Sequence, residues 1–321
     1  MRLMQHKGGP RLLVTDRQGA VYLERASVHV EGERVVYHIT DDDHRREFNI
    51  PHVNLAVLFL GQGTSISQPA MRLLAEEGVH LGVTGSGGSP LLMGSLTTYS
   101  ATRHFRELLP IYMEPARSLL AAKAVMRDRC ERMRKIGGAG AQKHLRQRET
   151  AGLNTLCARF EGSLDQTTDI QQLLGFEGNF SKACYAEFSR YAGFGKDPPF
   201  KREAGAGGKG GDPVARVNHL IDHGNYLCYG MAGAALWATG IPPHLSVFHG
   251  KTRAGGLVFD LADSFKDALV LPLAFALTQE KDAKEAEQKF RGRLINAFDD
   301  REVLKLAIAT IERMLEAAKD A

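Results

Sequence analysis

The apolar residues of this chain change their spacing near Leu96, and no other feature constrains its fold as strongly. Before that point apolar and polar residues alternate in short runs, as in residues 28–39, where a Glu-Gly turn separates two runs typical of strands. After a polar linker, apolar residues recur with the period of an α-helix. The sequence therefore predicts an α+β fold, with a small N-terminal β domain at residues 1–97 and a larger all-α domain at residues 98–321.

One helix is expected to interrupt the strands of the β domain. Ser67 is a suitable N-cap, Pro69 lies in the first turn, and Gly78 ends the helix. Further strands are expected at residues 11–15, 21–24, 54–60, 79–84 and 90–96. Helices of the second domain are expected at residues 105–136, 143–162, 168–193, 213–239, 261–279, 283–296 and 299–318. The glycines of residues 137–140 are interpreted as a helix stop.

The composition is that of a folded, water-soluble protein. Hydrophobic residues make up 43% and charged residues 24%, which excludes a disordered, collagen-like or coiled-coil chain. The four cysteines include no CxxC pair, so neither a zinc ribbon nor a disulfide framework is expected, and the reducing cytoplasm is the expected compartment. The first residues lack the apolar core of a signal peptide. The apolar run Ala268–Leu277 is far shorter than the about 20 residues of a membrane span, so no membrane contact is expected.

Positive charge is concentrated in the middle of the chain, although the net charge is only +4. Residues 98–216 hold 20 Lys and Arg against 13 Asp and Glu, whereas the segments on either side are slightly acidic. A local excess of this kind suits a polyanion such as nucleic acid. A solvated helical face explains the same count equally well, so charge alone leaves both interpretations open.

Two apparent nucleotide-binding motifs fail for lack of structural context. Residues 205–210 match G-x-G-x-x-G, but no strand precedes them, and the segment is expected to be a mobile basic loop. The GKT run at residues 250–252 resembles the end of a P-loop, yet Leu245 stands where the first glycine is required. A nucleoside triphosphatase is therefore not expected.

A histidine and three aspartates in residues 244–267 suggest a metal site. Asp260, Asp263 and Asp267 recur at i, i+3 and i+7, which places them on one face of a helix starting near Asp260, and His249 precedes them in a glycine-flanked segment. Carboxylates and an imidazole suit Mg²⁺ or Mn²⁺ at a phosphate. The alternative is an acidic first turn of a helix beside an ordinary loop histidine.

Glu177 is a further candidate ligand because it lies within an apolar stripe between Gly175 and Gly178. A carboxylate in such a position is either paired or ligating, since an uncompensated buried carboxylate loses its charge. An ion pair, for example with Lys182, explains the sequence as well as metal ligation does.

Three segments together resemble one family. They are GFEGNFSKACY around Glu177, DPVARVNHLIDHGNYLCYG at residues 212–230, and SVFHG with LVFDLADSFK within residues 246–266. In this order they resemble the CRISPR-associated endonuclease and integrase, the universal first protein of the spacer-acquisition module, and within it the I-F branch. That family also has a small N-terminal β domain before a larger all-α catalytic domain, so the resemblance covers the whole chain.

The resemblance implies roles for individual residues. It makes Glu177, His249 and Asp263 the ligands of a divalent metal, Mg²⁺ or Mn²⁺, with Asp260 as an acidic catalytic neighbour. The residues that it places next to DNA or at the border of the active site are Lys266, Arg253, Lys251, Arg72, Tyr229 and Asn218, where Lys251 and Arg253 can exchange roles. The basic loop with Lys196, Lys201, Arg202 and Lys209 is a candidate to close over DNA, and a surface loop without a role is the alternative.

The chemistry that the resemblance implies is phosphoryl transfer on DNA. The 3′-hydroxyl of a captured DNA fragment attacks a phosphodiester at the CRISPR repeat, or water cuts branched or linear DNA. The implied partners are double-stranded and branched DNA, a second copy of the chain, and a small ferredoxin-like subunit that the I-F branch fuses to a helicase-nuclease. Two other functions remain open: a non-catalytic DNA-binding scaffold of the same complex, and a metal hydrolase of small molecules, which would not need the basic segment.

Overall fold

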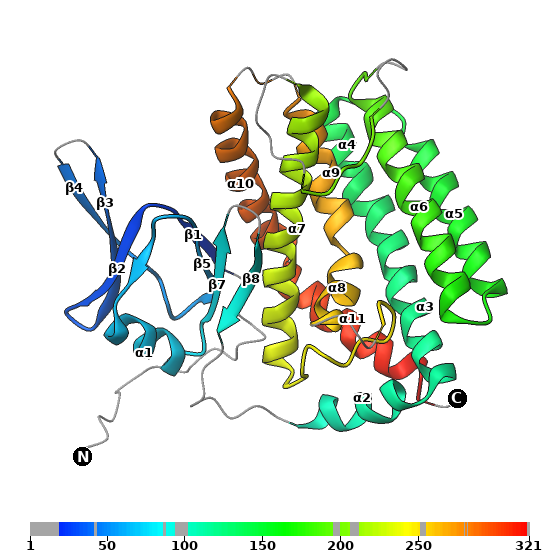
Figure 1. Ribbon diagram of the computed structural model, residues 1–321, viewed down its shortest axis with the longest axis horizontal. Coiled ribbons are helices and arrows are strands. Elements are labelled where there is room, and N and C mark those ends of the chain that lie inside the picture. The colour runs from blue at the N-terminus through cyan, green and yellow to red at the C-terminus, as the bar shows by residue number, and fades with distance from the viewer. Residues whose placement is uncertain are drawn as a thin grey trace.

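The computed structural model consists of two four-stranded sheets beside a larger body of helices (Figure 1). It describes residues 19–41, 44–85, 88–93, 102–194, 200–205, 212–250, 255–278, 280 and 282–319. The expected α+β class, with the strands first and the helices after them, is confirmed. The expected boundary at residues 97 and 98 and the expected strand at residues 11–15 lie outside the described residues. Among the described helices, none is long and apolar enough to span a bilayer.

The first sheet lies next to the helices. Its order is β1 (Gly19–Leu23), β5 (Leu55–Leu60), β7 (His80–Gly85) and β8 (Gly88–Met93). The first three strands are parallel and β8 is antiparallel to β7. Every residue of β5 is buried because both faces of this strand are covered. A fully apolar run of this kind is what a central parallel strand requires.

The second sheet lies at the far end of the molecule from the helices. Its order is β4 (His44–Asn49), β3 (Arg34–Asp41), β2 (Ala26–Glu31) and β6 (Ser65–Ile66). Strand β4 was not expected, because its sequence HRREFN has little apolar character. An edge strand gains its stability from backbone hydrogen bonds to one neighbour, so its sequence needs few apolar residues and shows little apolar-polar alternation.

The helix expected between the strands is confirmed as α1 (Gln68–Glu76). The Ser67 hydroxyl accepts a hydrogen bond from the Ala70 backbone N–H at 3.4 Å, as an N-cap does. Gly78 follows the helix with a φ of +72°, a left-handed conformation that glycine adopts without strain. The helix packs on β2 and β3 and closes a small core of its own.

The long helix expected at residues 105–136 is broken, and the expected stop at residues 137–140 is wrong. The described segments are α2 (Arg103–Met113), α3 (Pro115–Arg132), a π-helical turn (Met133–Gly137) and α4 (Gly138–Leu145). Pro115 begins the second helix, since proline suits a first helical position and disrupts an interior one. Gly140 stays helical because it packs closely on α9: a Cβ there would lie 2.7 Å from Pro272 Cγ.

The remaining helices are α5 (Ala151–Gln166), α6 (Ile170–Tyr191), α7 (Pro213–Ala238), α8 (Gly256–Asp263), α9 (Lys266–Ala276), α10 (Ala283–Asp300) and α11 (Val303–Ala317). The single helix expected at residues 261–279 is wrong, because α8 ends at Asp263 and α9 starts at Lys266. Ser264, between the two helices, accepts a hydrogen bond from the buried Arg132 guanidinium. Asp267 therefore does not share a helix face with Asp260 and Asp263, contrary to the expectation.

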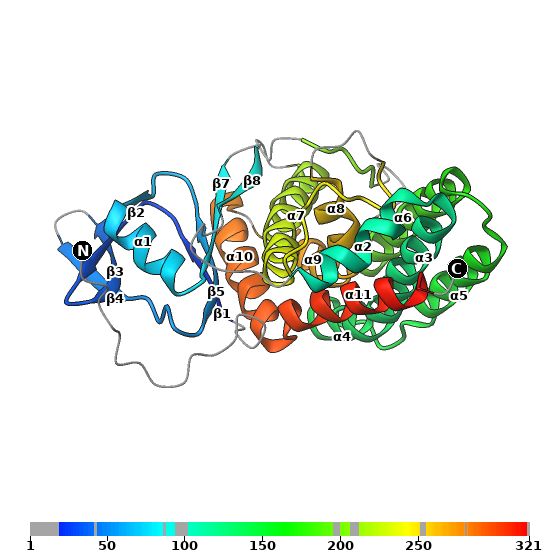
Figure 2. The same ribbon diagram turned by 90° about the horizontal axis from the view of Figure 1, so that it is seen from below.

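Helices α7 and α10 connect the helical body to the first sheet, with α7 against β5, β7 and β8 and α10 against β1 (Figures 1 and 2). The side chains of β5 divide between two cores: Val57 and Phe59 join the helical core, whereas Leu58 and Leu60 join the core under α1. Gly230 on α7 permits this contact, since a Cβ there would lie 2.2 Å from the Phe59 ring. The first sheet therefore belongs to both cores.

Candidate active site

Asp260 organises the segment that carries His249. The Asp260 side chain is fully buried on α8 and accepts five hydrogen bonds. Four come from Ser246 Oγ (2.9 Å) and the backbone N–H groups of Val247 (2.8 Å), Phe248 (3.1 Å) and His249 (3.0 Å), and the fifth comes from His249 Nδ1 (2.7 Å). The carboxylate therefore fixes both the loop backbone and the orientation of the imidazole.

The imidazole of His249 presents its other nitrogen to Asp263. A carboxylate only accepts hydrogen bonds, so Nδ1 donates to Asp260, and in the neutral imidazole Nε2 then keeps the lone pair. Nε2 lies 3.5 Å from Asp263 Oδ2, and both side chains are largely buried. A carboxylate that orients a histidine in this way is the usual outer partner of a metal-ligating imidazole.

Glu177 on α6 is held by a buried arginine. Arg129 Nη1 donates to Glu177 Oε1 at 2.6 Å, and the Ser181 hydroxyl donates to the same oxygen at 2.7 Å. Arg129 Nη2 pairs with Asp267 on α9. Burial opposes ionisation of Glu177, but the Arg129 guanidinium outweighs it, and the pKa of Glu177 lies below its usual value. Glu177 is therefore ion-paired in the structure, with Arg129 as the partner in place of Lys182, and its role as a metal ligand stays a prediction.

Lys266 interacts with two carboxylates of the site, those of Asp263 and Glu177. Its ammonium at the start of α9 pairs with Asp263 and also contributes to the lowered pKa of Glu177. Burial lowers the pKa of Lys266, although the charges of Asp267 and Glu177 act in the opposite direction. Helices α3, α6, α8 and α9 thus converge on one buried charge cluster, which we define as Arg129, Glu177, Asp260, Asp263, Lys266 and Asp267 together with His249.

The donor chemistry of this cluster fits a divalent metal. Two neighbouring ligands of an octahedral Mg²⁺ lie about 3.0 Å apart, and the 3.5 Å between His249 Nε2 and Asp263 Oδ2 is close to that spacing. The four carboxylates of the cluster exceed its Arg and Lys side chains by two formal negative charges, which a divalent cation would balance.

Glu177 stands farther from the other two expected ligands. Among the described residues, the only three histidine, cysteine or acidic side chains whose donor atoms all lie within 4.8 Å of one another are on strands β2 and β4. Arg129 and Lys266 explain this spacing, since each holds one of the expected carboxylate ligands by an ion pair. The structure therefore brings His249 and Asp263 together and places Glu177 across Lys266 from them.

Tyr229 lies beside α8. Its ring packs edge-on against Phe259, with 4.7 Å between the ring centroids, and also lies near Tyr226. Lys251 and Arg253, which the resemblance places at DNA, lie outside the described residues. Arg72 is exposed on α1, a helix that lies on the side of the molecule opposite α3, α6, α8 and α9 (Figure 1).

Asn218 holds the segment at residues 200–205. Its amide donates to the backbone carbonyls of Lys201 (2.8 Å) and Val214 (3.2 Å), and its oxygen accepts from Arg202 (3.0 Å) and the Glu203 N–H (2.9 Å). With four partners in a buried position, Asn218 positions the backbone of this segment. Direct contact of Asn218 with DNA stays a prediction.

The two basic residues of that segment differ in their exposure. Arg202 pairs with Asp222 and is largely buried, whereas the Lys201 side chain is 79% exposed and lies 3.3 Å from Glu203. Lys196 and Lys209 lie outside the described residues. Lys201 is accordingly the better placed of the two described side chains for a phosphate contact.

Sequence reasoning missed Arg129 and Ser246. Arg129 is one of several arginines in the basic segment at residues 98–216, and its burial follows only from the packing of α3 against α6 and α9. Ser246 lies 14 residues before the carboxylate that it contacts. Ser181 was not predicted either, although it follows Glu177 by four positions, a spacing that places two side chains on the same face of a helix.

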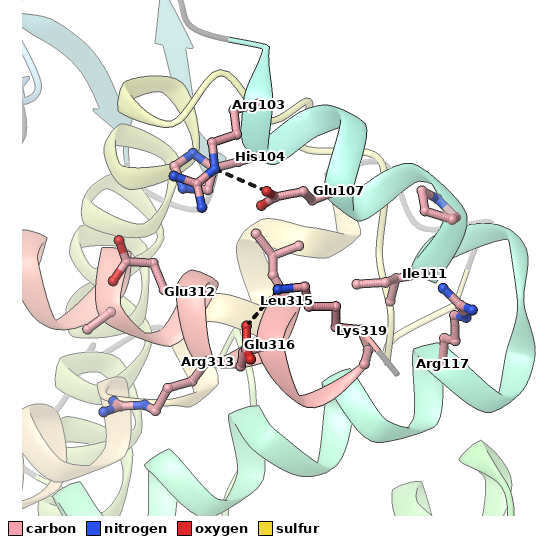
Figure 3. Close-up of a pocket in the computed structure, with 13 residues that line it drawn as sticks. Arg103, His104, Glu107, Ile111, Arg117, Glu312, Arg313, Leu315, Glu316 and Lys319 are labelled. Atoms are coloured by element: carbon pink, nitrogen blue, oxygen red, sulfur yellow. Dashed lines mark hydrogen bonds and ion pairs between the residues drawn. The ribbon is translucent and has the colours of Figure 1, made fainter. Parts of the chain in front are cut away.

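A cavity of about 570 Å³ lies elsewhere, between α2, the start of α3 and α11 (Figure 3). Two pairs of its charged side chains contact each other: Arg103 Nε donates to Glu107 at 3.0 Å, and Lys319 lies 3.7 Å from Glu316. None of the expected site residues lines this cavity. The candidate active site is therefore defined by its converging side chains and not by an open volume.

Comparison with known proteins identifies the family. A family model described as CRISPR associated protein Cas1 matches residues 20–312. The CRISPR-associated endonuclease Cas1 of Pectobacterium atrosepticum is 33% identical over 314 residues, covering 94% of this chain and 93% of its own length. The protein of the same name from Pseudomonas aeruginosa is 35% identical over 321 residues and is covered to 94%, as is this chain.

Solved structures share the fold. The crystal structure of a TtCas1–DNA complex is 26% identical with a TM-score of 0.65, covering 94% of this chain and 92% of that one. A Cas1 protein from Thermotoga maritima, 16% identical, has a TM-score of 0.69 and covers 92% of this chain and 97% of its own, which shows the fold alone. On the family model and the two relatives, this chain belongs to the CRISPR-associated Cas1 family.

Proposed function

We propose that this chain is a metal-dependent DNA endonuclease and integrase of CRISPR spacer acquisition, of the I-F branch. The observation that carries the proposal is the arrangement of His249, whose Nδ1 is held by Asp260 while Nε2 faces Asp263 at 3.5 Å. An imidazole prepared in this way beside a carboxylate is suited to metal ligation. The relatives named as endonucleases support the same chemistry.

Glu177, His249 and Asp263 would hold Mg²⁺ or Mn²⁺. When bound, the ion supplies charge stabilisation at a scissile phosphate and lowers the pKa of a bound hydroxyl. Asp260 keeps His249 in the tautomer with a free Nε2. For Glu177 to join the other two ligands, its ion pair with Arg129 and the contact of Lys266 with Asp263 have to loosen.

The residues around the metal ligands would position the DNA. Lys266, the cation next to Asp263, can move to a phosphate oxygen when the carboxylate turns to the metal. Lys251, Arg253 and Arg72 are further candidates for phosphate contacts, and Tyr229 borders the site beside α8.

Strand transfer requires no nucleoside triphosphate. The 3′-hydroxyl oxygen of a captured DNA fragment attacks phosphorus at the border of a CRISPR repeat, one phosphodiester bond forms, and one breaks. The hydroxyl proton leaves the nucleophile, and the displaced 3′-oxygen of the repeat strand takes one up. With water in place of the hydroxyl, the same groups would cut branched or linear DNA.

The basic middle segment, residues 98–216, supports DNA as the substrate, and the DNA complex of TtCas1 supports it independently. A homodimer and a ferredoxin-like subunit fused to a helicase-nuclease complete the proposed assembly, with residues 1–97 as its β domain. Four free, buried cysteines are compatible with the cytoplasm as the compartment.

Metal-dependent reaction of a labelled branched DNA tests the proposal. Wild type is expected to cut and join DNA with Mn²⁺ or Mg²⁺, and Glu177→Ala, His249→Ala and Asp263→Ala are expected to abolish both reactions while DNA binding persists. Asp165→Ala, at an exposed carboxylate on α5, is the matched control with full activity. Wild-type protein that binds DNA but reacts with neither metal would instead favour a DNA-binding scaffold, in which Arg129 and Lys266 neutralise the carboxylates permanently.

A further inference from the structure

A second cluster of potential metal ligands lies on the open face of the sheet that is far from the active site. His29 and Glu31 alternate on strand β2 and so point to the same side of the sheet. Glu47 comes from the edge strand β4, two strands away. The three donor atoms all lie within 4.8 Å of one another.

The strand register explains why these side chains meet. His29 is opposite Val36 on β3, and Glu47 on β4 is opposite His38, the next residue of β3 on this face, so His29 and Glu47 approach diagonally across His38 and Val36. Val36 lies beneath them. Its side chain is short, and it is only 7% exposed although the face is open to solvent. His29, Glu31 and Glu47 therefore converge above an apolar floor on a rigid sheet.

The spacing of two of the donor atoms is close to the spacing of two ligands on one metal ion. His29 Nε2 lies 3.6 Å from Glu47 Oε2, which is too long for a hydrogen bond. Two ligands of a tetrahedral Zn²⁺, at about 2.0–2.1 Å from the ion, lie about 3.3 Å apart. A small movement of either side chain would bring both atoms into the ligand sphere of one ion.

The charges and the orientation of His29 agree with that assignment. Two carboxylates at such short range create a negative potential that favours a cation, which Arg34, opposite Glu31 on β3, offsets only in part. Within the described residues, His29 Nδ1 is buried without a hydrogen-bond partner, so the ring meets the carboxylates through Nε2. The His38 ring packs edge-on against His29, with centroids 5.3 Å apart, and limits rotation of the ligand.

We propose that His29, Glu31 and Glu47 bind a divalent transition metal, with Zn²⁺ preferred, independently of the active site. One imidazole and two carboxylates suit Zn²⁺ and also accept Mn²⁺ or Co²⁺, with water in the remaining positions. The bound ion links β2 to β4 across β3 and so fastens an exposed edge strand to the centre of its sheet. Its role is to stabilise this sheet, not to take part in the reaction on DNA.

Titration of the full chain with ZnCl₂ tests this site. In an Asp263→Asn background, which weakens the active-site ligands, one equivalent of Zn²⁺ is expected to bind by isothermal titration calorimetry. Adding His29→Ala or Glu47→Gln is expected to weaken that binding at least tenfold, because each removes a ligand. Glu33→Gln, in the adjacent turn, is the matched control and is expected to bind as tightly as the background.

Hydrogen exchange provides a second readout that activity does not share. Zn²⁺ is expected to slow amide exchange in β4 of the Asp263→Asn chain and to have no such effect once His29→Ala is added. DNA cleavage by a His29→Ala chain with intact active-site residues is expected to equal that of wild type, so failure of this site and failure of the proposed function are distinguishable. Unchanged Zn²⁺ affinity in His29→Ala and Glu47→Gln, or no binding to the Asp263→Asn chain, would overturn the assignment.

Discussion

Asp260 is buried and acts on the site through the residues that it holds in place. Its carboxylate collects five donors from a four-residue segment, and this count leaves it little capacity to ligate a metal itself. The geometry therefore separates two aspartates that are three positions apart: Asp263 faces the imidazole nitrogen that is free to ligate, and Asp260 holds the opposite nitrogen. Asp260 is a positioning residue in this site.

Replacement of Asp260 by asparagine tests that role. The amide presents N–H groups to donors that need an acceptor, so Asp260→Asn is expected to destabilise the fold by about 2–3 kcal/mol and to weaken metal binding about 10- to 100-fold. Thermal unfolding and Mn²⁺ titration measure the two effects. Asp165→Asn, the same change at an exposed carboxylate, should shift stability by less than about 0.5 kcal/mol. Full metal affinity in folded Asp260→Asn would show that His249 needs no such support.

The ion pairs of Arg129 make the free energy of unfolding depend on pH in the acidic range. The pKa values of Glu177 and Asp267 lie below their ordinary values of 4.5 and 3.8, because the neighbouring cations outweigh burial. Both carboxylates therefore contribute stability that is present above these ordinary values and is lost as the pH falls through their lower folded-state values. Wild type is expected to lose stability on acidification through this range, as chemical denaturation at a series of pH values would show.

Removal of the Arg129 guanidinium reverses the effect of acidification on the two carboxylates. Arg129→Met removes the ion-pair partner of two buried carboxylates and leaves Lys266 as their neighbouring cation, which should cost about 3–5 kcal/mol at neutral pH. Their pKa values then rise, so acidification relieves the loss and the difference from wild type shrinks towards low pH. A pH-independent difference between the two chains would contradict this account of the charge cluster.

Among the helices and strands, the contact between α7 and β5 depends on one missing side chain. At Gly230 a Cβ would meet the Phe59 ring at 2.2 Å, so Gly230→Ala should destabilise the protein by about 1–3 kcal/mol through overpacking. Gly162→Ala on α5, where nothing lies within 4 Å, is the control and should stabilise by about 0.5–1 kcal/mol. Equal unfolding temperatures of the two variants would show that the contact is loose.

The ends of helices could be predicted from sequence where local chemistry determines them, as at the Ser67 cap. They could not be predicted where packing against other elements determines them. The glycines of residues 137–140 are turn signals by composition, yet they continue a helix because α9 packs against them. The break between α8 and α9 at Ser264 contains no proline or glycine from which it could have been predicted. At the site, motif order identified the expected ligands, but Arg129 could not be paired with Glu177 across 48 positions without the fold.

On the scale of the whole molecule, the first sheet is shared by two cores, so the strands and the helical body are coupled. Arg291 on α10 adds a polar contact to this coupling, since its Nη2 donates to Glu24, just after β1, at 2.6 Å. The candidate active site, by contrast, is built from helices α3, α6, α8 and α9 and from the loop that carries His249. We therefore expect changes on the outer sheet to alter stability without altering the reaction on DNA.

DNA affinity is expected to depend strongly on salt. With 6–10 phosphate contacts, the association constant should fall about 10³- to 10⁵-fold between 50 and 200 mM salt. Lys201→Ala, in the basic middle segment, should reduce the slope of log affinity against log salt by about 1. Lys305→Ala on α11, an exposed lysine outside that segment, should leave it unchanged. Equal slopes for both variants in a fluorescence anisotropy titration would exclude Lys201 from the interface.

The central claim is that Glu177 joins His249 and Asp263 in one metal-dependent site, and the rate of Mn²⁺-dependent strand transfer by Glu177→Gln tests it most directly. Glutamine keeps the size of the side chain and its contact with Arg129 but is a poor ligand for a hard cation. We predict a loss of about 100-fold or more in rate, with DNA affinity unchanged and the chain still folded. A rate within about twofold of wild type would contradict it and leave Glu177 as an ion-pair partner of Arg129.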